Sequence, residues 1–226
     1  MRPNRKDYFM RRGINCLFAC GVVALISGTA YASCEKNEQT AHASLPSVNG
    51  QVLAQACDDP DDEGGDIYLT FELGAKEKRN AHLKYEIASY VLELDTKIKF
   101  ENGTAQGVGI STGGGRDGNG MHYWMVRKTG VLIDLGDAPA LSINPFEANS
   151  FSALVTSSNS PYQSILYFYQ VKKDKLIATK AVGFIPKGNV VRSLSVLPDG
   201  QFQVLRARRL SQKQYLSCQD AKTRCW

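Results

Sequence analysis

Residues 66–73 read Asp-Ile-Tyr-Leu-Thr-Phe-Glu-Leu (DIYLTFEL), and this stretch decides the fold class. Its bulky aliphatic and phenylalanine side chains recur at every second position, at 67, 69, 71 and 73. Successive side chains of a β-strand point to opposite faces of a sheet, so a period of two predicts a strand with one buried face. A helix would need a period near 3.6, which this stretch does not have.

The same composition, rich in Ile, Val, Tyr, Phe and Thr, returns along the rest of the chain. Further strands are expected at 90–100, 122–127, 130–135, 151–156, 164–171, 175–184, 190–197 and 201–208. Tight turns are expected at 128–130, 173–174 and 198–200. Only residues 74–84 (GAKEKRNAHLK) have a helix-favouring composition. We therefore predict an all-β protein, with a single antiparallel β domain over residues 66–226 that is a sandwich or propeller-like.

The N-terminal 32 residues have the features of a secretory signal peptide. Positive charges precede an apolar run at 14–26, and Ala30-Tyr31-Ala32 offers a cleavage site after Ala32. The run is short for a membrane span, so no stable span is expected after cleavage. Alternatives are an uncleaved anchor, a twin-arginine signal at Arg11-Arg12, or lipidation of Cys34. The expected location is the periplasm, or outside the cell.

Four cysteines remain after the leader, and an even number in an exported protein predicts two disulfides. Local pairing, Cys34 with Cys57 and Cys218 with Cys225, is the simplest of the three possible connectivities. Residues 33–65 are otherwise polar, and we expect a disulfide-restrained segment ahead of the β domain. Its acidic loop at 58–66 lacks the spacing of an EF-hand calcium loop, so a solvated loop is expected there.

The charge of the whole chain is misleading, because much of the net charge of +5 lies in the leader. Residues 33–226 hold 22 basic and 21 acidic side chains, which gives no reason to expect nucleic-acid binding. The distribution is uneven: residues 33–171 carry a net charge of −8, and residues 172–226 a net charge of +9. This asymmetry is either compensation within one domain or a basic face for a partner.

The stretch Gly109-Ile110-Ser111-Thr112-Gly113 matches the G-x-S-x-G pattern of a hydrolase nucleophile. That pattern needs a helix after the serine. Residues 113–120 hold five glycines before a strand pattern, so we predict a glycine-rich loop and no catalytic role for Ser111. The spacing of cysteines and histidines favours no zinc site, and no cofactor, metal or enzymatic activity is predicted.

The candidate binding residues surround this loop: Arg116, Asp117, His122, Tyr123 and Trp124. They combine a planar cation with neighbouring aromatic rings, which are frequent anchors in protein interfaces. The alternative for Tyr123 and Trp124 is that one lies in the core and the other is half exposed. A second possible interface is the basic C-terminal third, with Arg206, Arg208 and Arg209.

Residues 113–177 also have a recognisable order of features. A glycine-rich turn precedes an aromatic strand at 123–126, a Lys-Thr-Gly turn and a short apolar strand follow, and Phe151–Leu154 and Tyr167–Val171 come after a polar connection. This order resembles exported bacterial proteins with degenerate integrin-like (FG-GAP-like) repeats. The resemblance implies a binding or inhibitor module of the envelope, although the calcium loop of such repeats is missing here.

The sequence therefore predicts an exported, non-enzymatic binding protein with a protein partner. An inhibitor of a wall-degrading enzyme and an immunity protein for a secreted toxin are the two forms considered. The alternatives are a structural protein of the envelope and a hydrolase with an unrecognised site.

Overall fold

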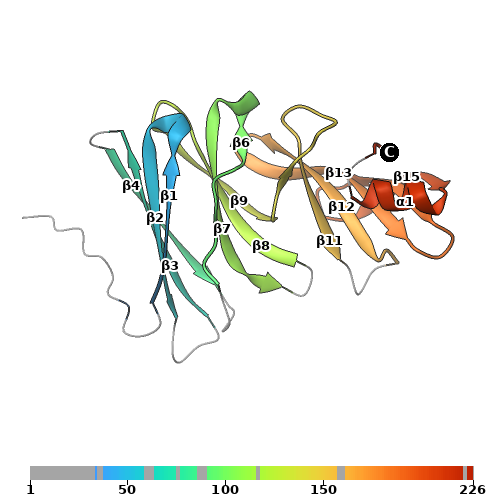
Figure 1. Cartoon of the computed structure of the whole chain (residues 1–226), viewed down its shortest axis with the longest axis horizontal. Coiled ribbons are helices and arrows are strands. Elements are labelled where there is room, and N and C mark those ends of the chain that lie inside the picture. Colours follow the sequence, from blue (N-terminus) through green and yellow to red (C-terminus); the bar gives the residue numbers. More distant parts are fainter. Residues whose placement is uncertain are drawn as a thin grey trace, which may run out of the picture. The chain divides into compact units, whose positions relative to one another are not determined.

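The computed structural model describes residues 34, 38–58, 64–74, 77–85, 91–115, 118–156, 161–220 and 223–225. They belong to one compact unit, Cys34–Trp226. The described residues form three antiparallel sheets and one short helix, which confirms the all-β antiparallel prediction (Figure 1). The predicted signal peptide lies outside the described residues.

The first sheet contains three strands that the sequence did not predict, β1 (Glu38–Leu45), β2 (Gly50–Asp58) and β4 (Glu77–Tyr85). With β3 (Gly65–Leu73) they pair in the order β1-β2-β3-β4, with a 3-10 turn at Pro46–Val48. The strands β1 and β2 bring Leu45 and Val52 into the same core cluster as Ile67 and Phe71 of β3. The helix-like composition of 74–84 is overridden in β4, where Ala81, Leu83 and Tyr85 pack on the core at alternate positions.

The prediction of a glycine-rich loop at 113–120 is wrong, because its described residues belong to two strands of the middle sheet. The middle sheet is built of β5 (Leu94–Asp95), β6 (Lys99–Phe100), β7 (Ala105–Gly115), β8 (Gly118–Val126) and β9 (Leu132–Pro139), with a 3-10 turn at Glu101–Gly103. Residues 109–115 continue β7 and pair with β8, and the Tyr123 ring lies against the backbone of Gly109. The strand expected at 90–100 is reduced to the short β5 and β6 within its described part, 91–100.

The third sheet follows the predicted strands closely. Its order is β10 (Ser142–Ile143), β11 (Phe151–Thr156), β12 (Ser164–Lys172), β13 (Lys175–Ile185), β14 (Val190–Val196) and β15 (Phe202–Arg209). The turn at Lys173-Asp174 has positive φ at both residues, 50° and 57°, as a two-residue hairpin turn requires.

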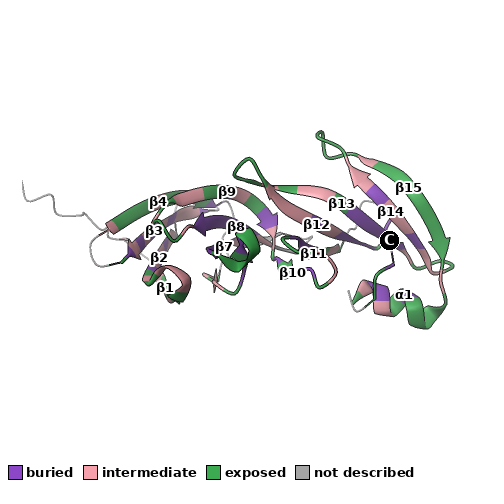
Figure 2. Ribbon diagram, turned by 90° about the horizontal axis from the view of Figure 1, so that it is seen from above, coloured by how far each residue is buried: buried purple, intermediate pink, exposed green. Residues whose placement is uncertain are grey.

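The three sheets pack face to face in the order of the sequence. One core cluster joins the first sheet to the middle sheet, with Phe71 and Trp124 in edge-to-face contact. A second cluster joins the opposite face of the middle sheet to the third sheet, with Phe100 against Phe151. The middle sheet is therefore buried on both faces, which Figure 2 shows as purple along β7 and β8.

The helix α1 (Gln212–Gln219) covers the far face of the third sheet. Ser211 begins it with a capping box, in which the Gln214 N–H donates to Ser211 Oγ and the Ser211 N–H donates to Gln214 Oε1. Tyr215 and Cys218 pack from α1 onto the sheet. No helix among the described residues is long and apolar enough to cross a membrane.

Both predicted disulfides are present, Cys34–Cys57 and Cys218–Cys225. The first ties the start of the described chain to β2. The second ties the end of α1 to the last described residues, and Cys218 is fully buried. Local pairing is thus the connectivity that the fold adopts.

Candidate functional site

Ser111 lies within β7 and not at a turn between a strand and a helix. It is 7% exposed, and its Oγ donates a hydrogen bond to the Val91 carbonyl and accepts one from the Glu93 N–H, both at 2.8 Å. Its backbone N–H also donates to the Glu93 carbonyl. The hydroxyl therefore holds segment 91–93 against β7, which gives it a structural role.

The predicted binding residues divide into two groups. Arg116 and Asp117 lie outside the described residues, so their role stays a prediction. His122, Tyr123 and Trp124 are on β8 and are 8%, 0% and 2% exposed. The expectation that one of the two aromatic rings would be half exposed is wrong, because the sheet is covered on both faces. In this fold neither ring offers a surface to a partner.

His122, on the inner strand β8, lies between two carboxylates of the edge strand β9. Its Nδ1 lies 2.7 Å from Asp137 Oδ1, and its Nε2 lies 3.2 Å from Asp134 Oδ1. Its ring packs on Trp124, with 4.5 Å between centroids, and Lys175 Nζ pairs with Asp134 at 3.4 Å. Both ring nitrogens are engaged, so the arrangement fits a structural link between β8, β9 and β13.

Tyr123 fixes the centre of the middle sheet. Its hydroxyl oxygen accepts a hydrogen bond from the Leu141 N–H at 2.8 Å. Burial raises the pKa of Tyr123 to about 12, because the phenolate would lose its hydration. The ring covers the backbone of Gly109 on the neighbouring strand. Across the described part of the chain, no group of three or more His, Cys, Asp or Glu side chains could hold a metal ion.

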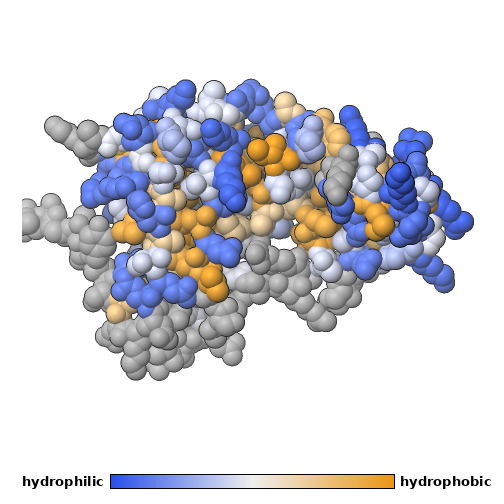
Figure 3. Space-filling view, in the orientation of Figure 1, coloured by the Kyte–Doolittle hydropathy of each residue, from blue (hydrophilic) through white to orange (hydrophobic). Residues whose placement is uncertain are grey.

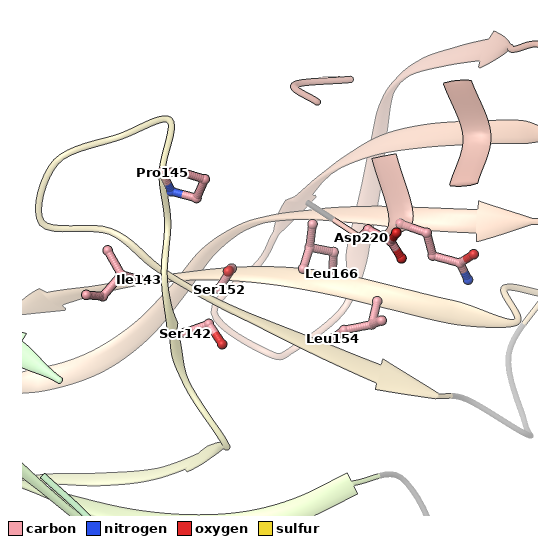
Figure 4. A pocket seen from close by; sticks show the side chains of 8 residues that line it. Ser142, Ile143, Pro145, Ser152, Leu154, Leu166 and Asp220 are labelled. Atoms are coloured by element: carbon pink, nitrogen blue, oxygen red, sulfur yellow. The ribbon is translucent and has the colours of Figure 1, made fainter. Parts of the chain in front are cut away.

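A pocket of about 410 Å³ opens beside the end of α1 (Figure 4). Its described lining consists of Ser142, Ile143, Pro145, Ser152, Leu154, Leu166, Gln219 and Asp220. Asp220 is the one ionisable side chain in that lining, and Gln219 Nε2 donates to Ser164 Oγ at 2.9 Å nearby. This composition suits weak binding of a small apolar group better than acid–base chemistry.

The edge strand β15 is the more distinctive surface. It is the last strand of the third sheet, so one side of its backbone has no neighbouring strand in the described structure. Seven of its eight residues, Gln203 to Arg209, are exposed, including Val204 at 49% and Leu205 at 63% (Figure 2). A strand with both faces exposed and one edge open is an available template for pairing.

Charge is concentrated on the same strand. Arg206, Arg208 and Arg209 lie within four residues of one another, and none forms an ion pair with a described carboxylate. In Figure 3 hydrophilic side chains gather over the end of the molecule that carries β15 and α1. We call Phe202–Arg209 and its open side the basic edge.

The sequence reading named these arginines but not the reason for their exposure. Two features of the sequence could have shown why these arginines are exposed. The turn at 198–200 predicts that 201–208 pairs with the preceding strand, and the capping box at 211–214 ends the strand series there. The last strand of a meander has only one neighbour, so it must be an edge.

The chain matches no family model, and no curated protein or solved structure is significantly similar to it. The resemblance to integrin-like repeats therefore remains a prediction, and the function has to be argued from the site alone.

Proposed function

We propose that this chain is an exported, non-enzymatic binding protein that holds an acidic partner protein at its basic edge. The observation that carries the proposal is the exposure of three arginines without described carboxylate partners on an open edge strand. Arginine is well suited to bind carboxylates, because its guanidinium presents a planar fork of donors.

Two further observations support this reading. Ser111 and His122, the residues closest in type to a catalytic set, have their polar atoms engaged in structural hydrogen bonds. The two disulfides are typical of proteins that fold in an oxidising compartment, where wall-degrading enzymes and secreted toxins are met. An inhibitor or immunity protein combines these properties.

The test measures binding to an exported hydrolase or toxin encoded beside this gene, by surface plasmon resonance at low and high salt. Replacing Arg206, Arg208 and Arg209 with serine is expected to slow association by about tenfold at low salt, and the difference should fade at high salt. The matched control replaces the exposed lysines Lys84, Lys97 and Lys99 with serine, which removes the same charge elsewhere.

An equal loss in both triple variants would show that only net charge matters and would overturn a specific basic edge. Unchanged binding in the arginine variant, together with weakened binding in Arg116→Ala, would move the interface to the glycine-rich stretch 113–120 of the sequence.

A further inference from the structure

Two of the three arginines of the basic edge lie on one face of the strand, and its apolar side chains Phe202 and Val204 lie on the other. Cross-strand partners share a face of a sheet, and Arg208 and Arg206 lie opposite Val191 and Ser193 of β14. Val191 belongs to the cluster under α1, so both arginines lie on the helix-covered side of the sheet. Phe202 and Val204 lie opposite Val196 and Leu194, on the other face.

That other face continues a hydrophobic cluster that the fold leaves incomplete. Tyr162, Ile165, Ala181 and Leu194 are buried there, while Tyr167 and Phe202 are only partly covered at its margin. The Tyr167 and Phe202 rings lie 6.0 Å apart, and Val204 extends the cluster to the open edge. A strand added beside β15 would cover Phe202 and Val204.

The backbone of β15 also has N–H groups that point to its open side, as the addition of a strand requires. Hydrogen-bonded and non-hydrogen-bonded pairs alternate along an antiparallel ladder. The Leu210 N–H donates to the Asn189 carbonyl, so the pairs 191/208 and 193/206 are hydrogen-bonded toward β14. The N–H groups of Ala207 and Arg209 therefore point away from β14, toward the open side.

From these observations we infer that the partner binds as an extended segment that adds a strand to β15, with carboxylates alternating with apolar side chains. Side chains two residues apart on a strand are about 6.6 Å apart on the same face, which matches two acidic residues to Arg206 and Arg208. The apolar residues of the same segment that lie opposite Val204 and Phe202, further along the strand, would cover those two side chains. This inference rests on the proposed function and specifies the partner's chemistry.

A second copy of this chain fits the edge less well. Antiparallel pairing of β15 with another β15 would bring arginines opposite arginines, and like charges directly opposite are destabilising. The arginines and the extra residue at Leu205, which interrupts the register, are also features that keep an edge strand from pairing with itself. The experiment must therefore distinguish an edge strand that only avoids pairing from one that binds a partner strand.

The probe is a dye-labelled, end-blocked octapeptide in which glutamate and valine alternate, titrated with the full chain in fluorescence anisotropy. We expect saturable binding that weakens with salt. Arg206→Gln with Arg208→Gln should weaken it by about tenfold, since charge-assisted pairs are lost. Ala207→Pro should weaken it by about fivefold to tenfold, since it removes an outward amide but no bond to β14. Ala207→Ser, which keeps that amide, is the matched control.

Three comparison peptides complete the design: one with lysine for glutamate, one with four glutamates followed by four valines, and one with N-methylated backbone amides. None should bind as well as the alternating peptide. If the block peptide binds equally and Ala207→Pro has no effect, the edge is a simple anion site and strand addition is overturned, while the proposed function stands. If no acidic peptide binds, and the natural partner binds the arginine variant as well as it binds the wild-type chain, both proposals fail.

Discussion

At the scale of single residues, Tyr123 and Gly109 show how the middle sheet is packed. A Cβ atom added to Gly109 would lie 2.5 Å from Tyr123 Cε1, and the ring is fully buried. We expect Gly109→Ala to lower the free energy of unfolding by about 1–3 kcal/mol, because the ring or the strand must shift. Urea denaturation measures this. Gly120→Ala, whose Cβ would meet nothing nearer than 3.2 Å, should cost less; an equal cost would contradict the packing argument.

The same tyrosine makes stability depend on alkaline pH. The pKa of Tyr123 is about 12 in the fold and near 10 in the unfolded chain, so folding favours the neutral phenol. Its contribution is fully present below pH 10 and is lost as the pH rises from 10 toward 12, a change of about 2–3 kcal/mol.

Denaturation curves from pH 8 to 12 test this contribution. Tyr123→Phe should be less stable than wild type at pH 8, since the Leu141 N–H loses its acceptor, and should decline less steeply above pH 10. Tyr169, whose pKa burial also raises to about 12, keeps part of the decline in both proteins. Parallel curves for the two proteins would mean that Tyr123 ionises as easily in the fold as in solution.

The alternation argument did not predict that both Tyr123 and Trp124 are buried. Alternation along 122–126 predicts one inner and one outer face, and that logic holds only for a sheet with one solvated face. The run Met121–Val126 is instead apolar with little interruption, the pattern of a strand covered on both sides, and this signal was present in the sequence.

At the scale of elements, α1 depends on its disulfide. The helix has eight residues, too few for stability in isolation, and it is held by Tyr215, Cys218 and the Cys218–Cys225 bridge. Replacing both cysteines with alanine should lower the free energy of unfolding by about 2–3 kcal/mol. Hydrogen exchange should show the amides of 212–219 losing protection ahead of the strands.

Replacing Cys34 and Cys57 with alanine is the matched control. It should destabilise the protein somewhat more, by about 3–4 kcal/mol, since that bridge closes a longer loop, but leave the protection of α1 unchanged. If both double variants lower the hydrogen-exchange protection of α1 equally, the helix exchanges through global unfolding. The Cys218–Cys225 bridge then does not hold the helix locally.

The sequence predicted the elements whose own residue pattern indicates a strand or a turn, whatever elements lie next to them. The strand at 66–73 alternates strongly, the strand at 164–171 is rich in aromatic and β-branched residues, and the turn at 173–174 ends in an aspartate, which tolerates positive φ. The strand β4 was missed because its composition favours helix and only its neighbours β3 and the middle sheet select the extended form. The basic edge depends on the strand order, which follows only when the turn at 198–200 is combined with the capping box at 211–214.

At the scale of the whole molecule, the stack of sheets ends differently on its two sides. On the third sheet α1 covers the last face, while the outer face of the first sheet is polar. One row of that face joins Gln51, Glu72 and Lys78 on adjacent strands, with Lys78 Nζ 2.6 Å from Glu72 Oε1. Lys78 and Gln51 also hold the pKa of Glu72 below its ordinary value. Such a face offers little apolar surface with which to continue the stack.

The last prediction concerns this polar face. Gln51→Val, Glu72→Val and Lys78→Val together would place an apolar row on an exposed sheet, which invites packing against a second copy. We expect a rise in molar mass with concentration, measured by size-exclusion chromatography with light scattering. The matched variant with threonine at the same three positions loses the same ion pair but keeps a hydroxyl at each position, so it should keep the mass of the wild-type chain. If the threonine variant associates as well, loss of the charged pair is the cause; if the valine variant keeps the wild-type mass, the polarity of the face is not what ends the stack.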